Sequence, residues 1–377
     1  MSFGFAPYLL QHLKVVAAEN NPATKVTPTG FLKMLLENNP SLQLPEYEKL
    51  RLSNQQGHIK NVQLKYLRRI NPSNIDTTDD CVNDHIPVYA ETSLTAPKFA
   101  KYSFFISDDT IARYEDEASR TVALGQPATE FMNEQLEMLM TVVQGMVGKI
   151  DTELLKAVTF GKNVSSGNSG NTATPLNILK DATQFDLTTG IGQLLSQCQE
   201  NEFTGTPLIV GGGKFNAFAN YLQQLGPALN GTNQAEAFRQ IKYYYDQWSQ
   251  ASQTNGWDVD NIGVFSKGSI GFVDLDKYIG FRSGTKGIST FFRIPLPVVP
   301  AQNDGTADLM TFDAQLRYLD CPTDISDGYG DTVTVSRGWQ LIISKNYGLF
   351  QIPGDAYQSG DRLYGNNGAM LFNITNS

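Results

Sequence analysis

The feature that most constrains the fold of this chain is a long apolar stripe with helical spacing. Hydrophobic residues recur at steps of three and four between Thr129 and Val158, so they share one face of a helix. Lys156 near the end suits the helix dipole, and Gly161 is expected to supply a left-handed C-terminal cap. About 30 residues at 1.5 Å each give a rod of about 45 Å, the length of a structural backbone. The stripe consists of Met132, Leu136, Leu139, Val143, Met146, Ile150, Leu154 and Val158.

Residues 1–56 are expected to form an arm rather than a compact unit. Two short helical segments, Tyr8–Ala18 and Gly30–Glu37, are separated by Asn-Pro and Thr-Pro pairs that interrupt helices. Such an arm has too few apolar residues to pack alone. We therefore expect it to lie on its own body or on a neighbouring subunit.

Residues 57–110 are expected to form a long β-hairpin. Apolar and polar residues alternate over Val62–Tyr66, and the alternation returns over Ala100–Ile106. The segment Asn71–Asp80 between them is acidic, rich in turn formers and too long for an ordinary hairpin loop. We interpret the hairpin as a projecting arm whose tip meets another molecule. The hairpin carries a basic stripe formed by Lys60, Lys65, Arg68 and Arg69. This stripe is either a solvated face or a set of charges that fixes the register between subunits.

A polar segment of small residues, 162–175, is expected to be a linker, and a mixed unit follows it. A buried strand at Pro207–Val210 leads through three glycines into a helix, and a second helix is expected at Gln234–Gln250. Helices and strands mix without a βαβ repeat, so the α+β class is favoured. Further strands are expected at Val264–Phe265, Ser269–Val273, Tyr278–Phe281, Thr290–Ile294, Val333–Ile343 and Tyr347–Ile352.

The glycine run that begins at Gly211 does not match a phosphate-binding loop. In that motif Leu208 would have to be glycine, and Phe215 stands where a serine or threonine must follow Lys214. A dinucleotide-binding fingerprint fails as well, because Asn216 replaces its third glycine. We interpret the glycines as a tight turn between a strand and a helix.

Two acidic clusters contain potential metal ligands. The first cluster, around Cys81, is either a solvated acidic tip or a metal site. It lacks the second pair of Cys or His ligands that a zinc site requires. The second resembles a calcium-binding turn around Gly328 and Gly330, but it misses the helix-loop-helix spacing and the final Glu, so only incidental calcium binding is considered. The clusters are Asp79, Asp80, Cys81, Asp84 and His85, and Asp324, Asp327 and Asp331.

Composition narrows the function classes. The chain has only three histidines and three widely spaced cysteines, which lowers the expectation of catalysis and favours synthesis in a reducing cytosol. Its net charge of −9 argues against a dedicated nucleic-acid binder. No apolar run approaches the roughly 20 residues of a membrane span, and no secretory signal is visible. We expect no catalytic residues, no cofactor and no resident metal.

The order of these parts resembles the major capsid proteins of tailed bacteriophages, which have the Hong Kong 97-type fold. In that family an N-terminal arm precedes an extended loop, a spine helix organises a peripheral domain, and an axial domain is inserted before the chain returns. The matching segments are Ile59–Ile70 with Lys98–Ile106, Met132–Gly161, Thr206–Val210 and Ser266–Phe272. The resemblance implies an arm at 1–56, an extended loop at 57–110, a peripheral domain with the spine helix at 111–175, an axial domain at 176–330 and return strands at 331–377.

The same resemblance implies a structural subunit, not an enzyme, that forms pentamers and hexamers of an icosahedral capsid around double-stranded DNA. Its expected partners are copies of itself, portal, scaffolding or decoration proteins, and packaged DNA held by weak nonspecific contacts, with no membrane. Its expected location is the virion, after synthesis in the host cytoplasm. The alternatives are an encapsulin-like shell or another virion structural protein, and a cytosolic α+β enzyme.

Overall fold

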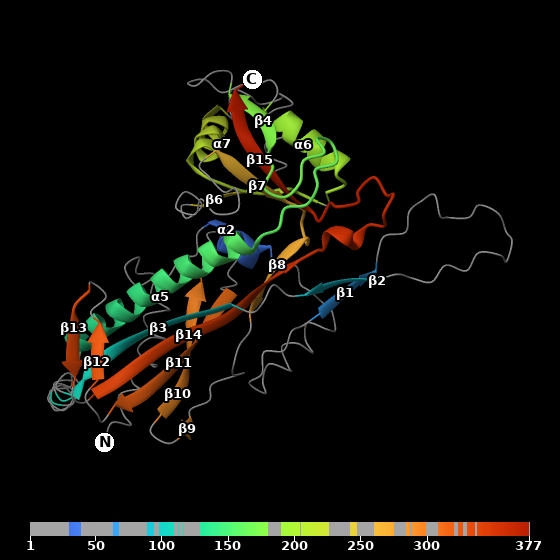
Figure 1. Cartoon of the computed structure of the whole chain (residues 1–377). Coiled ribbons are helices and arrows are strands. Elements are labelled where there is room, and N and C mark those ends of the chain that lie inside the picture. Colours follow the sequence, from blue (N-terminus) through green and yellow to red (C-terminus); the bar gives the residue numbers. More distant parts are fainter. Residues whose placement is uncertain are drawn as a thin grey trace.

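The described part of the chain contains two large β-sheets, one long helix and two separate two-stranded sheets (Figure 1). The computed structural model describes residues 30–38, 63–67, 89–93, 98–108, 112, 116, 129–179, 190–203, 205–225, 242–246, 260–274, 284–286, 289–298, 308–319, 323–326, 330–335 and 338–376. The expected helix at Tyr8–Ala18 and the expected strand at Tyr278–Phe281 lie outside these residues.

The predicted long helix is confirmed as α5 (Thr129–Ala157). From Leu139 onwards the members of its apolar stripe are buried, with exposures of 0–5%. The stripe packs on two strands of the first sheet and on the short helix α2 (Gly30–Glu37), which was also predicted. Each fully buried aliphatic side chain stabilises the fold by about 1.5–3 kcal/mol, so this face holds the molecule together.

Gly161 does not cap α5 in the left-handed conformation, so that prediction is wrong. The glycine is needed for a close approach instead, because a Cβ there would lie 2.5 Å from Asn367 Oδ1. Nothing in the local sequence announces this contact, since Asn367 is more than 200 residues away along the chain.

The first sheet, called the long sheet here, is antiparallel and lies along α5. Its central strand β14 pairs along most of its length with β3 on one side and with β11 on the other, and its last residues pair with β8. The strand order is β3 (Lys98–Ser107), β14 (Gly338–Gln351), β11 (Asp308–Leu319), β10 (Ser289–Val298) and β9 (Gly284–Lys286), with β8 (Ile270–Asp274) beside the end of β14.

The predicted pairing of the long hairpin is wrong. Strand β1 (Gln63–Leu67) pairs with β2 (Tyr89–Ser93), whereas the expected second strand is β3 of the long sheet. Alternation identifies a half-buried strand but not its partner, and β3 buries Ala100 and Ile106 within the core that α5 and β14 share. The expected projecting tip at Asn71–Asp80 lies outside the described residues.

The second sheet has buried residues on both faces. Leu208 and Val210 of one strand join the core around α2 and α5, whereas Ile209 joins a second core beneath two helices. The strand order is β4 (Thr174–Leu179), β15 (Ala369–Asn376), β7 (Asn261–Phe265), β5 (Leu208–Gly211) and β6 (Lys242–Tyr245), and the two helices are α6 (Gly190–Glu200) and α7 (Gly213–Leu225).

The helix predicted at Gln234–Gln250 is wrong where the structure describes it. Residues 242–245 form β6, which runs parallel to β5. Three consecutive tyrosines favour a strand, and the free edge of β5 supplies the partner. The final strand β15 pairs with β4 and β7 of the second sheet.

The segment 162–175, predicted to be a linker, is tied to the body of the subunit by a partly buried amide network that begins at Asn163. Asn163 donates to Gln197 Oε1 at 2.8 Å, and its own Oδ1 accepts from Asn201 at 3.0 Å. Asn366 in turn donates to Asn201 Oδ1 at 2.8 Å, which ties the segment after α5 to the loop before β15. Small polar residues suit both linkers and such networks, so composition alone could not separate the two.

A short hairpin of β12 (Thr323–Ser326) and β13 (Thr332–Val335) lies near the N-terminal end of α5 (Figure 1). Within the described ranges, no helix combines the length and apolar character that crossing a bilayer requires.

Val143→Asp should abolish cooperative unfolding of the subunit. Val143 is fully buried in the middle of the stripe, and an unpaired buried charge costs several kcal/mol, comparable to the total stability of a domain. Circular dichroism during a thermal melt measures this, with Thr141→Asp on the exposed face of α5 as the control. If Val143→Asp melts like the parent chain, this face of α5 is not packed in the core as described.

Candidate assembly groove

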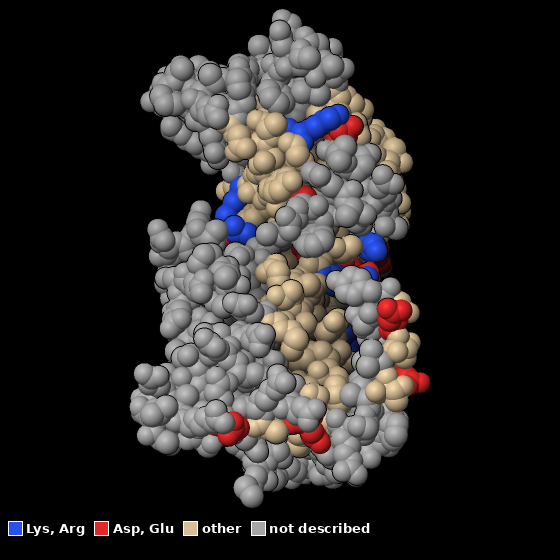
Figure 2. Space-filling model, turned by 90° about the vertical axis from the view of Figure 1, so that its left-hand side faces the viewer, with Lys and Arg blue, Asp and Glu red and all other residues tan. Residues whose placement is uncertain are grey.

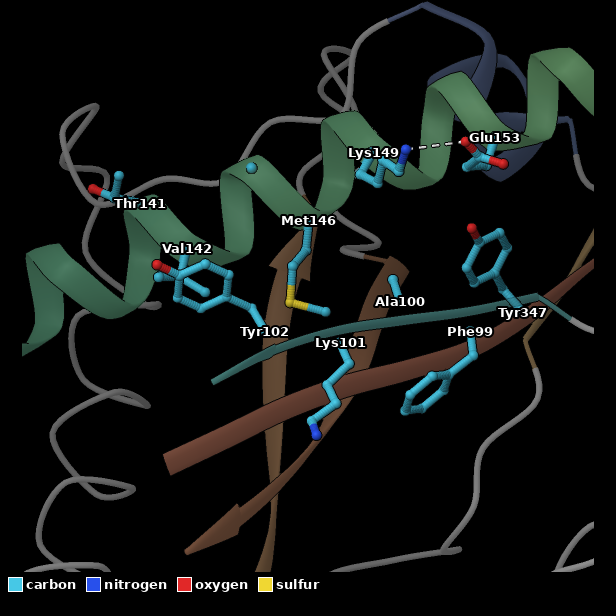
Figure 3. Close-up of a pocket in the computed structure, with 11 residues that line it drawn as sticks. Phe99, Ala100, Lys101, Tyr102, Thr141, Val142, Met146, Lys149, Glu153 and Tyr347 are labelled. Atoms are coloured by element: carbon cyan, nitrogen blue, oxygen red, sulfur yellow. Dashed lines mark ion pairs between the residues drawn. The ribbon is translucent and has the colours of Figure 1, made fainter. Parts of the chain in front are cut away.

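A groove of about 800 Å³ runs between α5 and the edge strand β3 (Figure 3). Three elements line it, with most side chains coming from the helix and the strand. The lining residues are Phe99, Ala100, Lys101, Tyr102, Thr141, Val142, Gly145, Met146, Lys149, Glu153 and Tyr347.

The helix contributes the face next to its buried stripe. Met138, Val142, Gly145 and Lys149 follow one another at steps of four, three and four, so they form a second line along α5. Met138 is 37% exposed and Val142 is half-buried. Gly145 leaves a gap in this line, because a Cβ at that position would meet no atom within 4 Å.

The strand contributes exposed aromatic rings at a sheet edge. Phe99 is 57% exposed and Tyr102 is 51% exposed, which is unusual for side chains of this size. Figure 3 shows Tyr102 on the side of β3 that faces Val142, while Phe99 and Lys101 leave the strand on its other side. Among the described strands, β3 pairs only with β14, so its outer edge offers backbone donors and acceptors to an added strand.

A polar wall bounds the groove at one end. Lys149 and Glu153 form an ion pair at 3.1 Å, one helical turn apart. Tyr347 of β14 is buried beside them, and burial together with the Glu153 carboxylate raises the pKa of Tyr347 to about 12. The phenol therefore stays neutral at physiological pH. Exposed ion pairs add little stability to a fold. The main effect of this wall is therefore to make one end of the groove polar.

Aromatic rings, aliphatic side chains and one ion pair are the components of a protein–protein interface. The exposed edge of β3 adds main-chain hydrogen bonding to that surface. The groove is therefore suited to receive an extended, partly apolar segment of another polypeptide.

The glycine run is confirmed as a strand-to-helix turn. Strand β5 ends at Gly211 and α7 begins at Gly213. A Cβ on Gly211 would lie 2.6 Å from Ile262 Cγ2, so the close approach of β7 excludes a side chain. Lys214 forms an ion pair with Asp260 at 2.5 Å rather than standing free as a phosphate ligand would.

The second acidic cluster is only partly described. Asp324 accepts a hydrogen bond from Thr334 Oγ1 at 2.6 Å across the β12–β13 hairpin, and Asp331 is exposed. Asp327 and Gly328 lie outside the described residues, as does the whole cluster Asp79–His85. In the described part of the chain, no group of three or more His, Cys, Asp or Glu residues is placed to hold a metal ion.

The groove itself was not predicted from the sequence. Its signal is the line Met138, Val142 and Gly145, which continues the helical period one position away from the buried stripe. That line points to a surface only once β3 is known to lie at a sheet edge beside α5.

No protein-family model matches the chain, and no curated protein sequence matches it. Several solved phage structures are similar to it. A structure from Mycobacterium phage Bobi is 10% identical with a TM-score of 0.44, and the match covers 97% of this chain and 98% of that one. The capsid asymmetric unit of Cyanophage A-1(L) is 13% identical with a TM-score of 0.42, covering 84% and 90%. The capsid structure of Cyanophage P-SCSP1u is 12% identical with a TM-score of 0.39, covering 85% of each chain. The two cyanophage structures are phage capsids, the class of protein that the order of parts in the sequence resembles.

Proposed function

We propose that this chain is a structural subunit that assembles with copies of itself into the icosahedral capsid of a tailed bacteriophage. The observation that carries the proposal is the groove between α5 and β3, with its exposed Phe99 and Tyr102 and its open strand edge. A stable monomer rarely leaves large aromatic rings exposed beside an unpaired edge, because such surfaces associate.

The β1–β2 ribbon supports the same proposal. It is a separate two-stranded sheet, and a lone two-stranded ribbon is at best marginally stable in water. It contacts the body of the subunit at η3 (Gly354–Ala356) through β2. Packing on a neighbouring copy would give the ribbon the additional support that it needs.

The parts have corresponding roles in this proposal. Helix α5 is the spine, the long sheet belongs to the peripheral domain, the second sheet with α6 and α7 is the axial domain, and the N-terminal arm and extended loop reach neighbours. The groove of one copy meets a different surface of the next, and such heterologous contacts close into rings, here pentamers and hexamers. The chain has a structural rather than an enzymatic role.

The purified chain should therefore assemble in solution. Analytical ultracentrifugation should show species much larger than 41.6 kDa, and negative-stain microscopy should show rings or closed particles. A chain that stays monomeric at high concentration over a range of salt would contradict the proposal.

Gly145→Trp should block assembly without unfolding the subunit. The indole would extend into the groove, because a Cβ at this position would meet no atom within 4 Å. Gly145→Ala is the matched control, because it leaves the groove open while improving the helix by up to about 1 kcal/mol. Sedimentation reports assembly and a thermal melt reports folding. If Gly145→Trp assembles like the parent chain, the groove is not an interface.

Unassembled subunits should bind duplex DNA negligibly at physiological salt. On the face in Figure 2, the described Lys and Arg side chains are scattered, and several lie beside acidic ones rather than forming a continuous basic patch. Phosphate contacts by clustered cations dominate duplex affinity, and 38 acids oppose 29 bases here. A gel-shift titration with random-sequence duplex tests this prediction. Salt-sensitive binding with a sub-micromolar Kd would contradict the proposal that the chain makes only weak contacts with DNA.

A further inference from the structure

Two aspartates from distant parts of the chain hold the first turn of α2. Leu32 N donates to Asp151 Oδ1 of α5 at 2.5 Å, and Phe31 N donates to Asp246 Oδ2, directly after β6, at 3.1 Å. Amides in the first turn of a helix have no partner within that helix, so these carboxyl groups satisfy two of them. They connect α2 to the long helix and to the second sheet at one point.

The docked position of α2 leaves no room for variation at this point. Gly30 has a φ of +64°, and a Cβ there would overlap the Asp246 carboxyl group. The apolar side of α2 is buried against α5, β5, β6 and β8. Since α2 follows residues 1–29, its docking fixes where that N-terminal segment meets the body of the subunit.

The two carboxyl groups share one buried site. Asp151 is 1% exposed and Asp246 is fully buried. Asp151 Oδ2 is buried and receives no hydrogen bond from the described residues. Two carboxylates cannot donate to each other, whereas a proton on one of them supplies the missing donor.

Burial raises the pKa of Asp151 well above its ordinary value, and the charge of Asp246 raises it next. The hydrogen bond from Leu32 opposes this rise, while a hydrogen bond with Asp246 adds to it. Asp246 also contributes to raising the pKa of Tyr243, after burial and Tyr245. Both effects have the sign expected of a negative charge shared by a closely packed carboxyl pair.

Several other charged groups on the surrounding elements form ion pairs with one another. Lys242 pairs with Glu37 at 3.2 Å, and Glu153 pairs with both Lys149 and Lys156. Besides Asp151, the titratable groups on these elements are Lys33 and Glu37 of α2, Glu130, Glu134, Glu137, Lys149, Glu153 and Lys156 of α5, Lys242, Tyr243, Tyr244 and Tyr245 of β6, and Asp274 of β8.

We propose that Asp151 and Asp246 form a proton-dependent clasp, which holds α2 on the subunit while the pair shares one proton and loosens α2 when that proton is lost. This regulation of the N-terminal segment goes beyond the assembly role and does not rest on it.

The direction of the pH dependence follows from linkage. The docked state binds a proton that exposed aspartates would release, so its stabilisation is fully present below the ordinary Asp pKa. That stabilisation is lost as the pH rises through the raised pKa of the docked pair. Each pKa unit of difference changes the docking equilibrium about tenfold.

Amide hydrogen exchange of the full chain between pH 5 and pH 10 tests the clasp. Protection of the α2 amides, corrected for intrinsic exchange and compared with β7 in the same molecule, should fall about tenfold or more as the pH rises. Asp151→Asn should remove this pH dependence, because the amide still accepts from Leu32 and can donate to Asp246. Its α2 should be better protected than the parent's at pH 10.

Two further variants make the result decisive. Asp246→Asn removes the charge of Asp246 but leaves Asp151 buried, so it should reduce the slope of the profile without abolishing it. Glu37→Gln, on the same helix but outside the pair, should keep the parental pH dependence. Protection of parental α2 that does not change with pH, or an undiminished slope in Asp151→Asn, would overturn the proposal.

Discussion

The burial of one face of α5 is the interaction on which the rest of the structure depends. From Leu139 to Leu154 the stripe contacts β3 and β14 along its length, and α2 packs beside it. Helix α2 in turn contacts β5 and β6, so a single core continues from the long sheet into one face of the second sheet. A helix of 29 residues is about 44 Å long, and α2 is the element that joins it to the second sheet.

The same packing explains why a groove exists beside α5. The helix buries only one face, so the neighbouring line from Met138 to Lys149 remains at the surface above β3. Both walls of the groove belong to elements that the core holds rigidly. A surface of this kind needs little rearrangement when it binds, which lowers the entropic cost of association. In the proposed capsid, fold stability and interface geometry would therefore come from adjacent faces of one helix.

Periodicity predicted the elements that bury a continuous apolar face. It identified α5, α2 and the turn from β5 into α7, because local spacing alone determines which residues share a face. It failed where a partner decides the outcome. The alternation in β3 could not reveal that β14 is its neighbour, and the tyrosines of β6 read as a helix until β5 was known to lie beside them. The pairing of Asp151 with Asp246 and the contact of Gly161 with Asn367 are equally invisible to local patterns. The groove depends on both kinds of information. The line of residues on α5 follows from helical periodicity, whereas the position of β3 at a sheet edge depends on the strand order.

The position of β15 has a consequence for the order in which the subunit can form during synthesis. This strand lies between β4 and β7, and β4 is made roughly 200 residues earlier in the chain. The segment 338–376 also supplies β14, the centre of the long sheet. Neither sheet can close until the ribosome has made these residues, and contacts of such long range are slow to form. A nascent chain therefore displays β3 without β14 behind it, and the groove takes shape only after residues 338–351 have been made. Any partner that recognises the groove would thereby select chains in which β14 is in place over shorter nascent chains.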